Sequence, residues 1–219
     1  MRDNLKEHNK NLPDKQLINA PFEHPLGQAY YSAMNCAANY AFANREILGH
    51  LVRKAFWKVF GRDTRVDLIY DVAHNIAKVE EYEVDGKRRK LVVHRKGATR
   101  SLGPGSEKVP SIYREVGQPV IIPGDMGTAS YLLVGTKKAE EKAFGSTAHG
   151  AGRVLGRSAA LKKLDYREVL DELAEKNIVV MSKSKKTLVE EAPEVYKDVD
   201  RVVQIVHEIG ISRRVARMI

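Results

Sequence analysis

The chain has 219 residues, 43% of them hydrophobic and 30% charged, with one cysteine and a formal net charge of +9. This length can bury one substantial core or two small ones. No stretch approaches the ~18 apolar residues of a membrane span, and the polar start lacks the apolar core of a secretory signal. A single cysteine excludes an internal disulfide and favours a reducing, cytoplasmic setting. The basic excess favours a polyanionic partner such as nucleic acid, although a basic protein without such a partner fits it equally well.

The first quarter of the chain predicts an irregular leader followed by helix. Residues 1–26 contain three prolines and are expected to be irregular. Residues 28–60 lack proline, are rich in alanine and repeat apolar residues at helical spacing, which predicts one long helix or two abutting ones. Gly61 is placed to end this helix as its C-cap. Cys36 is interpreted as a small core residue of the helix.

The middle of the chain is rich in β-prone residues. Two such runs flank Asp85-Gly86, which is a strong hairpin signal. Two further short runs flank a glycine-rich loop. The expected strands are residues 66–73, 79–84, 87–94, 118–123 and 130–135.

Helices and strands are mixed in the last third of the chain as well. Residues 151–163, 165–176 and 197–209 predict helices, while residues 177–182 and the last ten residues predict strands. The elements do not alternate strictly as strand, helix, strand. The sequence therefore predicts an α+β fold with mixed sheets, a long N-terminal helix and several shorter helices.

His149 lies in the glycine-rich segment GSTAHGAGRVLGR, where small residues allow a phosphate to approach the backbone. A helix is expected to begin just after Gly150, so that its N-terminus favours an anion and keeps the imidazole neutral. Arg153 and Arg157 are then expected on one face of this helix, suited to bidentate phosphate contact. A neutral imidazole beside a phosphate can act as a nucleophile and form a phosphoramidate. A glycine-rich turn with an ordinary histidine explains the segment equally well.

His74 follows the expected strand 66–73 and precedes Asn75. Neutral imidazole is a common ligand of transition metals, and strand ends are places where ligands converge. A hydrogen-bonded structural histidine is the competing interpretation.

Two more loops carry residues suited to phosphates. In residues 123–131, Gly124 and Gly127 allow a backbone anion nest, and Ser130 or Thr128 can donate a hydrogen bond to a ligand. In residues 94–101, basic side chains surround a glycine at a strand end, which suits a nucleic-acid backbone but also fits a solvated basic loop. These basic residues are Arg95, Lys96 and Arg100.

The segments DVAHNIAKVE, HRKGATRS, PGDMGTASY and STAHGAGR occur in this order, and together they resemble the RtcB family of tRNA-splicing RNA ligases. NLPDKQLINAPF and SAMNCAANYAFANR are similar to that family too, so the resemblance covers essentially the whole chain. It implies a GTP- and Mn²⁺-dependent RNA ligase, with two Mn²⁺ ions in the complete site. Such an enzyme joins an RNA 3′-phosphate or 2′,3′-cyclic phosphate to a 5′-hydroxyl end, as in tRNA splicing and RNA repair.

By this resemblance, His149 is the histidine that GTP guanylylates, His74 is a Mn²⁺ ligand, and Ser130 and Tyr196 contact the guanosine nucleotide. Together with the loops above, the candidate nucleotide-binding residues are Asn75, Gly124, Asp125, Gly127, Ser130, His149, Gly150, Gly152 and Tyr196. The candidate RNA- or phosphate-binding residues are Arg95, Lys96, Arg100, Arg153 and Arg157.

The resemblance also implies that residues 1–219 are the C-terminal part of a longer catalytic domain. The other metal ligands, an Asp, a Cys and further His residues, are expected in an N-terminal half outside this sequence. Asp125 stands where many members have a nucleotide-contacting Ser. The implied partners are RNA, such as tRNA exon halves, GTP and that N-terminal half; the need for an archease-type activator stays open. The alternative is a non-catalytic RNA- or nucleotide-binding fragment or subunit, and a metal-dependent phosphoesterase would need a fuller set of ligands.

Overall fold

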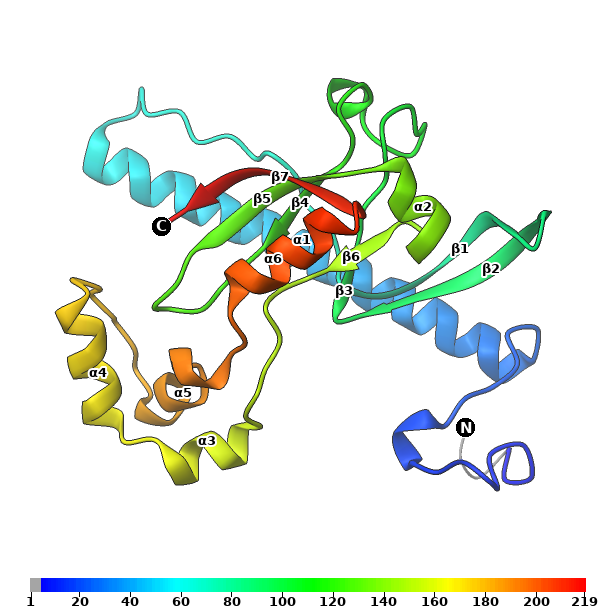
Figure 1. Ribbon diagram of the computed structural model, residues 1–219, viewed down its shortest axis with the longest axis horizontal. Helices are drawn as coiled ribbons and strands as arrows, with labels where there is room; N and C mark the ends of the chain where they lie inside the picture. The colour runs from blue at the N-terminus through cyan, green and yellow to red at the C-terminus, as the bar shows by residue number, and fades with distance from the viewer. Residues whose placement is uncertain (1–4) are drawn as a thin grey trace. The chain divides into compact units, whose positions relative to one another are not determined.

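The structure is a computed structural model that describes residues 5–219. The chain divides into two compact units, with the boundary in the sequence between Asp71 and Val72. The first unit is helical, and the second contains the β-strands together with shorter helices (Figure 1). The predicted α+β class with a long N-terminal helix is therefore confirmed. None of the helices in the described part combines the length and the apolar character that a membrane crossing requires.

The first unit is dominated by α1 (Pro25–Phe60), preceded by a short 3-10 helix, η1 (Lys15–Leu17). Pro25 occupies the first turn, where its missing N–H costs nothing. The preceding His24 accepts a hydrogen bond from the Leu26 N–H at 3.1 Å. Gly61, at φ 94°, donates its N–H to Trp57 O and ends the helix as predicted. The predicted helix is confirmed, and it starts three residues earlier than expected.

Residues 66–73 do not form the predicted strand. Side chains of α1 hold the segment that follows the helix: Arg53 donates to Val66 O at 3.3 Å, and Trp57 donates to Thr64 O at 2.9 Å. Arg45 forms an ion pair with Asp71 at 2.6 Å. A β-prone run becomes a strand only when a neighbouring edge pairs with its backbone, and residues 66–73 are not paired in the sheets that the structure describes.

Cys36 is exposed, so its interpretation as a core residue is wrong. Within α1, Gly27 is the buried residue, because the helix packs little against the rest of its own unit. Apolar side chains in the second half of the helix are exposed as well. They are Ile47, Leu48, Leu51, Val52, Phe56, Val59 and Phe60.

The second unit begins with a long hairpin, β1 (Asn75–Val84) and β2 (Lys87–Lys96), paired antiparallel over ten residues each. Asp85 and Gly86 form the turn, and both have positive φ (52° and 70°), as a two-residue type I′ turn requires. The predicted hairpin is confirmed and extends further than the sequence pattern indicated. Its open end places Asn75 opposite Lys96.

A three-stranded antiparallel sheet has the order β4 (Pro119–Ile122), β5 (Ser130–Gly135) and β7 (Ser212–Met218). Alternate residues of β5 are buried, and α6 (Val199–Glu208) packs its apolar side against them. The predicted strands and the predicted C-terminal helix are confirmed. The buried core between the sheet and α6 contains Val120, Ile122, Tyr131, Leu133, Val199, Val203 and Val206.

Two very short strands, β3 (Ala98–Arg100) and β6 (Ser146–Ala148), pair with each other. The sequence pattern did not predict either of them, or α2 (Lys137–Ala143), which leads into β6. The 3-10 helix η2 (Ser111–Tyr113) lies in the connection between β3 and β4. The β3–β6 pair connects the hairpin to the loop after β6.

Three short helices form a second apolar cluster: α3 (Arg157–Lys163), α4 (Tyr166–Glu175) and α5 (Lys185–Glu190), followed by η3 (Pro193–Val195) (Figure 1). The helix predicted for residues 165–176 is confirmed. The helix predicted from residue 151 starts only at Arg157, because Gly152 adopts φ 78° and breaks the helical backbone.

Residues 177–182 do not form the predicted strand either. Ile178 and Val180 pack against the second cluster, whereas Val179 and Met181 are 90% and 95% exposed. The side chains alternate in exposure as they would in a strand, but this segment is not paired in the sheets that the structure describes.

Candidate functional site

His74 and His149, which are 75 positions apart in the sequence, lie side by side in the second unit. Their ring centroids are 4.8 Å apart and their planes differ by 2°, so the imidazoles are stacked. His74 immediately precedes β1, and His149 immediately follows β6. The structure thus brings together the two histidines that the sequence singled out.

Strand register explains why the two rings meet. In the hairpin, Asn75 pairs with Lys96; in the next ladder, Ala98 pairs with Ala148. Gly97, which has φ 71°, is the single residue between Lys96, where the first ladder ends, and Ala98, where the second begins. A Cβ built on Gly97 would lie 3.5 Å from His149 Nε2. Gly97 therefore sets the backbone against the imidazole, a role that sequence reasoning missed although the glycine lies within a segment it had singled out.

Burial and neighbouring basic side chains favour the neutral form of His149. Burial lowers the pKa of His149 from its ordinary value, and the electrostatic effects of His74 and Lys96 lower it further. The sequence predicted a neutral ring for a different reason, a helix beginning after Gly150. That reason is wrong because α3 starts at Arg157, but the neutral, nucleophilic form is still favoured.

The described residues supply only part of a metal shell. Between residues 5 and 219, no group of three or more His, Cys, Asp or Glu side chains is arranged to hold an ion. His74 offers an imidazole, a donor that Mn²⁺ accepts. Among the described residues, His74 therefore fits as one ligand of a Mn²⁺ site, and the set of ligands is incomplete.

The loop between β4 and β5 is a closed turn held by its own side chains. Asp125 Oδ1 accepts from the Gly127 N–H at 2.8 Å, and Thr128 Oγ1 accepts from the Asp125 N–H at 3.1 Å. A Cβ on Gly124 would meet Ala129 O at 2.2 Å, so only glycine fits there. A Cβ on Gly150 would lie 3.6 Å from Pro123 O, which places the loop beside the segment that follows His149.

Ser130 is half-buried at the start of β5, at the end of this loop. Gly124, Asp125, Gly127, Ser130 and Gly150, all predicted as nucleotide-binding, therefore belong to two neighbouring segments. Asp125 uses its carboxylate in the turn.

Tyr196 is joined to the segment after His149 by Arg153. The Arg153 guanidinium lies 5.1 Å from the centre of the Tyr196 ring, and Nη1 donates to the Tyr196 hydroxyl at 3.1 Å. The same nitrogen donates to Glu191 Oε1 at 3.3 Å, and the Tyr196 hydroxyl donates to Glu191 Oε2. Burial and the hydrogen bond to Glu191 raise the pKa of Tyr196.

Backbone contacts reinforce this link: the Lys197 N–H donates to Gly152 O at 2.9 Å, and Arg153 pairs with Tyr196 in a β-bridge. The predicted residues Gly152 and Tyr196 are thus adjacent. Arg157 is not on a shared helix face with Arg153, as had been expected. Its side chain is 71% exposed and lies 4.0 Å from Glu190.

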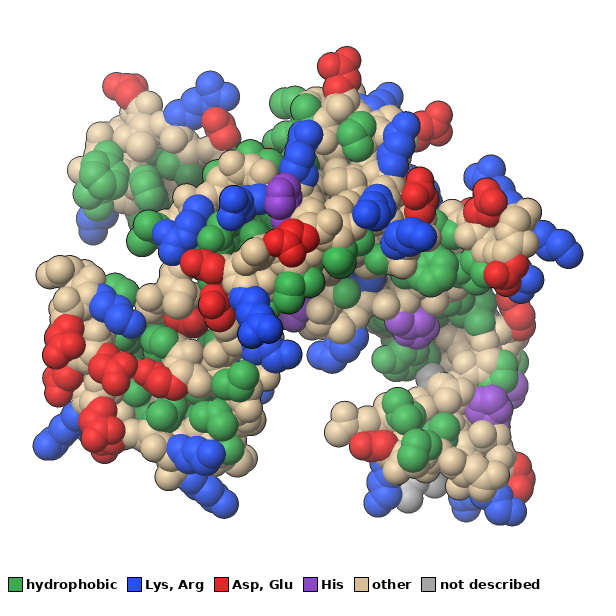
Figure 2. Space-filling view, viewed as in Figure 1, with side chains coloured by type: hydrophobic (Ala, Val, Ile, Leu, Met, Phe, Trp, Pro, Cys, Tyr) green, Lys and Arg blue, Asp and Glu red, His purple; other side chains and the backbone are tan. Residues whose placement is uncertain are grey.

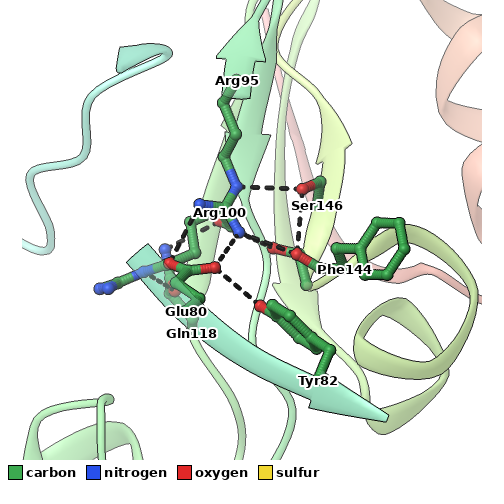
Figure 3. Close-up of polar contacts among 8 residues, drawn as sticks. Glu80, Tyr82, Arg95, Arg100, Gln118, Phe144 and Ser146 are labelled. Atoms are coloured by element: carbon green, nitrogen blue, oxygen red, sulfur yellow. Dashed lines mark hydrogen bonds and ion pairs between the residues drawn. The ribbon is translucent and has the colours of Figure 1, made fainter. Parts of the chain in front are cut away.

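Arg95 requires a correction: the sequence predicted a phosphate contact, but the side chain is only 1% exposed and faces the interior. Its guanidinium forms two hydrogen bonds to Glu80, Nη1 to Oε1 at 3.1 Å and Nη2 to Oε2 at 2.7 Å. Tyr82 donates to the same carboxylate at 2.8 Å (Figure 3). A buried cation requires such a partner, and it is therefore not free to meet a phosphate.

The other basic residues of this segment are placed differently. Lys96 is exposed and close enough to His149 to affect its charge, so it stays a candidate phosphate contact. Arg100 is half-buried and donates Nε to Gln118 Oε1 at 3.0 Å. Figure 2 shows Lys and Arg side chains spread over this face of the molecule and interspersed with acidic ones. Net charge therefore does not identify the site, whereas the stacked imidazoles do.

The Glu80–Arg95 pair predicts a loss of stability in acid. Burial raises the pKa of Glu80, but the hydrogen bonds and charge of Arg95 outweigh this, so the pKa falls below the ordinary 4.5. Because the folded-state pKa is the lower one, the stabilisation is complete above pH 4.5 and is lost as pH falls through the folded-state pKa. Urea unfolding across this range should show the decline.

The matched variant is Glu80→Gln, which cannot titrate. It should be less stable at neutral pH by ~3–5 kcal/mol, because Arg95 is left without a counter-charge. Its acid decline should be shallower than that of the unaltered chain. An identical acid decline in both would show that Glu80 does not carry the effect.

The fold and the site define an α+β domain in which a pair of stacked imidazoles lies beside Gly97 and a glycine-containing segment. Comparison with known proteins then identifies the family. The family model described as "tRNA-splicing ligase RtcB" matches residues 1–219. The chain belongs to the RtcB family.

Curated relatives support this assignment. The tRNA-splicing ligase RtcB of Methanococcus maripaludis is 54% identical over 221 residues, which is 100% of this chain and 46% of the relative. That of Archaeoglobus fulgidus is 54% identical over 98% of this chain and 45% of its own length. That of Pyrococcus furiosus is 55% identical over 94% of this chain and 22% of its own length. The chain therefore spans less than half the length of these relatives.

Proposed function

We propose that this chain carries the guanylylated histidine and much of the nucleotide pocket of a GTP- and Mn²⁺-dependent RNA ligase. The proposed reaction joins an RNA 3′-phosphate or 2′,3′-cyclic phosphate to a 5′-hydroxyl end, with tRNA exon halves as substrates. One observation carries the proposal: His149 is partly buried and stacked on His74, beside Gly97, and its pKa is lowered by burial. Membership of the RtcB family, whose named relatives are tRNA-splicing ligases, supports it.

In the proposed first step, the unprotonated ring nitrogen of His149 attacks the α-phosphorus of GTP. An N–P bond forms, the bond to the β-phosphate oxygen breaks, and pyrophosphate leaves. The GMP group then passes to the RNA 3′-phosphate, which releases His149. The 5′-hydroxyl oxygen finally attacks that activated phosphate and expels GMP. A 2′,3′-cyclic phosphate must first be opened by water.

The residues around His149 are proposed to bind GTP and to orient it for attack by the imidazole. Lys96 can approach a phosphate of the nucleotide, and Gly97 leaves room beside the ring. Ser130 and Tyr196 are proposed to hold the guanosine, on segments adjoining the backbone of Gly150 and Gly152 respectively. Arg153 would act by keeping Tyr196 in place, since its guanidinium is directed to Tyr196, Glu191 and nearby carbonyl groups.

His74 is proposed as one Mn²⁺ ligand. When bound, the metal would neutralise charge on the phosphates. We expect the anionic donors to come from outside the described residues, because no group of three or more His, Cys, Asp or Glu side chains is arranged there to hold an ion. We therefore expect the complete site to need the N-terminal part that the longer relatives possess.

The test is covalent labelling with α-labelled GTP and Mn²⁺, of the chain alone and of the chain mixed with the N-terminal part of the Methanococcus maripaludis relative. Acid-labile label is expected in the mixture. His149→Ala should abolish it, because the ring nitrogen that attacks the α-phosphorus is removed. His94→Ala is the matched control: His94 is an exposed histidine of β2, and its loss should leave the label unchanged.

A folded chain that takes no label in either setting would contradict the proposal. If such a chain still bound RNA ending in a 3′-phosphate, the alternative of a non-catalytic RNA- or nucleotide-binding fragment would replace it. The incomplete metal shell is the observation that favours this alternative.

A further inference from the structure

Arg95 is directed at the segment that leads to His149. Beyond its pair with Glu80, Nη2 donates to Phe144 O at 2.8 Å and to Gly145 O at 3.3 Å, and Nε donates to Ser146 Oγ at 3.0 Å. Figure 3 shows the guanidinium lying between Glu80 on one side and the Phe144–Ser146 backbone on the other. One buried cation therefore joins the hairpin to the start of β6.

The segment that Arg95 contacts is one whose path needs support. Phe144 and Gly145 have positive φ values of 49° and 58°, so the chain turns sharply where α2 ends and β6 begins. Left-handed backbone is unfavourable for a residue such as Phe144. Only Ser146–Ala148 separate this turn from His149. A small shift at Ser146 would therefore move the imidazole.

Arg95 is also close in sequence to the residues that adjoin the two imidazoles. It is two residues before Gly97, the residue facing the His149 ring, and its neighbour Lys96 pairs with Asn75, which follows His74. Both imidazoles are thus attached to segments that this guanidinium joins.

Stability alone does not require this arrangement. A buried ion pair stabilises a fold no better than well-packed apolar residues of similar volume, whereas the fork of a guanidinium fixes several groups at set angles. We propose that the buried Glu80–Arg95 pair is a positioning device that holds His149 in register with His74. Its effect on catalysis rests on the proposed function, but its effect on the two imidazoles does not.

The first test is therefore spectroscopic and uses the 219-residue chain without nucleotide. Stacked rings shift each other's proton signals, so His74 and His149 should give displaced Hε1 signals, assigned with the His149→Asn variant. In Arg95→Lys the charge remains but the fork is lost. Both signals should move toward those of an exposed histidine such as His207.

Two further variants keep the test decisive. Ser146→Ala removes one Arg95 contact and leaves the ion pair intact, so it should move the signals less but in the same direction, even if Arg95→Lys fails to fold. Leu173→Ala removes buried methyl groups from the second apolar cluster and should lower the melting temperature without moving either signal. Unmoved imidazole signals in folded Arg95→Lys and Ser146→Ala would overturn the proposal.

The second readout is single-turnover labelling of His149 at saturating GTP, in the mixture described above. Misplacement by about 1 Å costs ~10²-fold in rate, so Arg95→Lys should lower the rate constant at least ~10-fold with unchanged GTP affinity and unchanged labelled fraction. A purely structural role would lower the labelled fraction and leave the rate constant unchanged, which would refute positioning. If the unaltered chain takes no label, the proposed function fails, and the imidazole signals alone decide this inference.

Discussion

Replacing Gly97 by valine should slow guanylylation of His149 by ~10²-fold and also destabilise the fold. Gly97 has φ 71°, and a Cβ at this position would already lie 3.5 Å from His149 Nε2. The Cβ itself makes an ordinary contact, but the two methyl groups of valine would extend from it toward the ring. Left-handed backbone costs an L-residue ~1–2 kcal/mol, and displacement of the ring by about 1 Å should cost ~10²-fold in rate.

The hairpin turn offers a matched control for this substitution. Gly86 has nearly the same φ, 70°, but among the described residues no atom lies within 4 Å of its Cβ position. Gly86→Val should therefore carry the backbone cost alone and leave the labelling rate constant unchanged. The measurements are urea unfolding and single-turnover labelling of both variants. Equal rate constants for the Gly97 and Gly86 variants would show that the approach to His149 does not matter.

The second large effect is expected for Arg153→Met. This change removes the contact with the Tyr196 ring and the hydrogen bonds to Tyr196, Glu191 and the Glu190 carbonyl. It leaves Glu191 without its cation in a partly buried place. Each such loss costs ~1–3 kcal/mol, so we expect the free energy of unfolding to fall by ~2–4 kcal/mol.

The Arg153→Met substitution should also destabilise one region of the fold more than the rest. Amide hydrogen exchange should accelerate in α5 and η3 before it does in the β4–β5–β7 sheet, because Arg153 joins those helices to the segment after His149. GTP affinity should fall too, if Tyr196 holds the nucleotide as proposed.

Arg157→Met is the comparison for this prediction. The Arg157 side chain is 71% exposed, and its ion pair with Glu190 is long, at 4.0 Å. Its removal should therefore change the free energy of unfolding by less than ~0.5 kcal/mol. A similar, small change for both arginines would mean that the Arg153 network contributes little to stability.

Local signals in the sequence predicted those elements that local physics decides. Asp85-Gly86 supplied a turn that only a few residue pairs favour, and Gly61 ended the long helix where its N–H can reach back to Trp57. The short β-prone run in 130–135 matched a strand whose alternate residues are buried. These features depend on residues that are neighbours in the sequence.

The errors came from features that depend on distant residues. Residues 66–73 and 177–182 have the composition of strands but are not paired in the described sheets. The sequence around Arg95 indicates a basic loop, because its counter-charge, Glu80, is fifteen positions away. The contact of His74 with His149 depends on a three-residue ladder, β3–β6, that is too short to leave a periodic pattern. The sequence context singled out both histidines and the family resemblance gave their roles, whereas their stacking is seen only in the structure.

The β1–β2 hairpin offers a practical way to observe this site. Its open end adjoins His74, and its turn lies ten residues away along each strand. At ~3.3 Å per residue this is a separation of roughly 30 Å. Exposed turns with free surroundings accept insertions, and Gly86 has such surroundings among the described residues. A small fluorescent or affinity tag inserted between Asp85 and Gly86 should therefore report on nucleotide and RNA binding without entering the site.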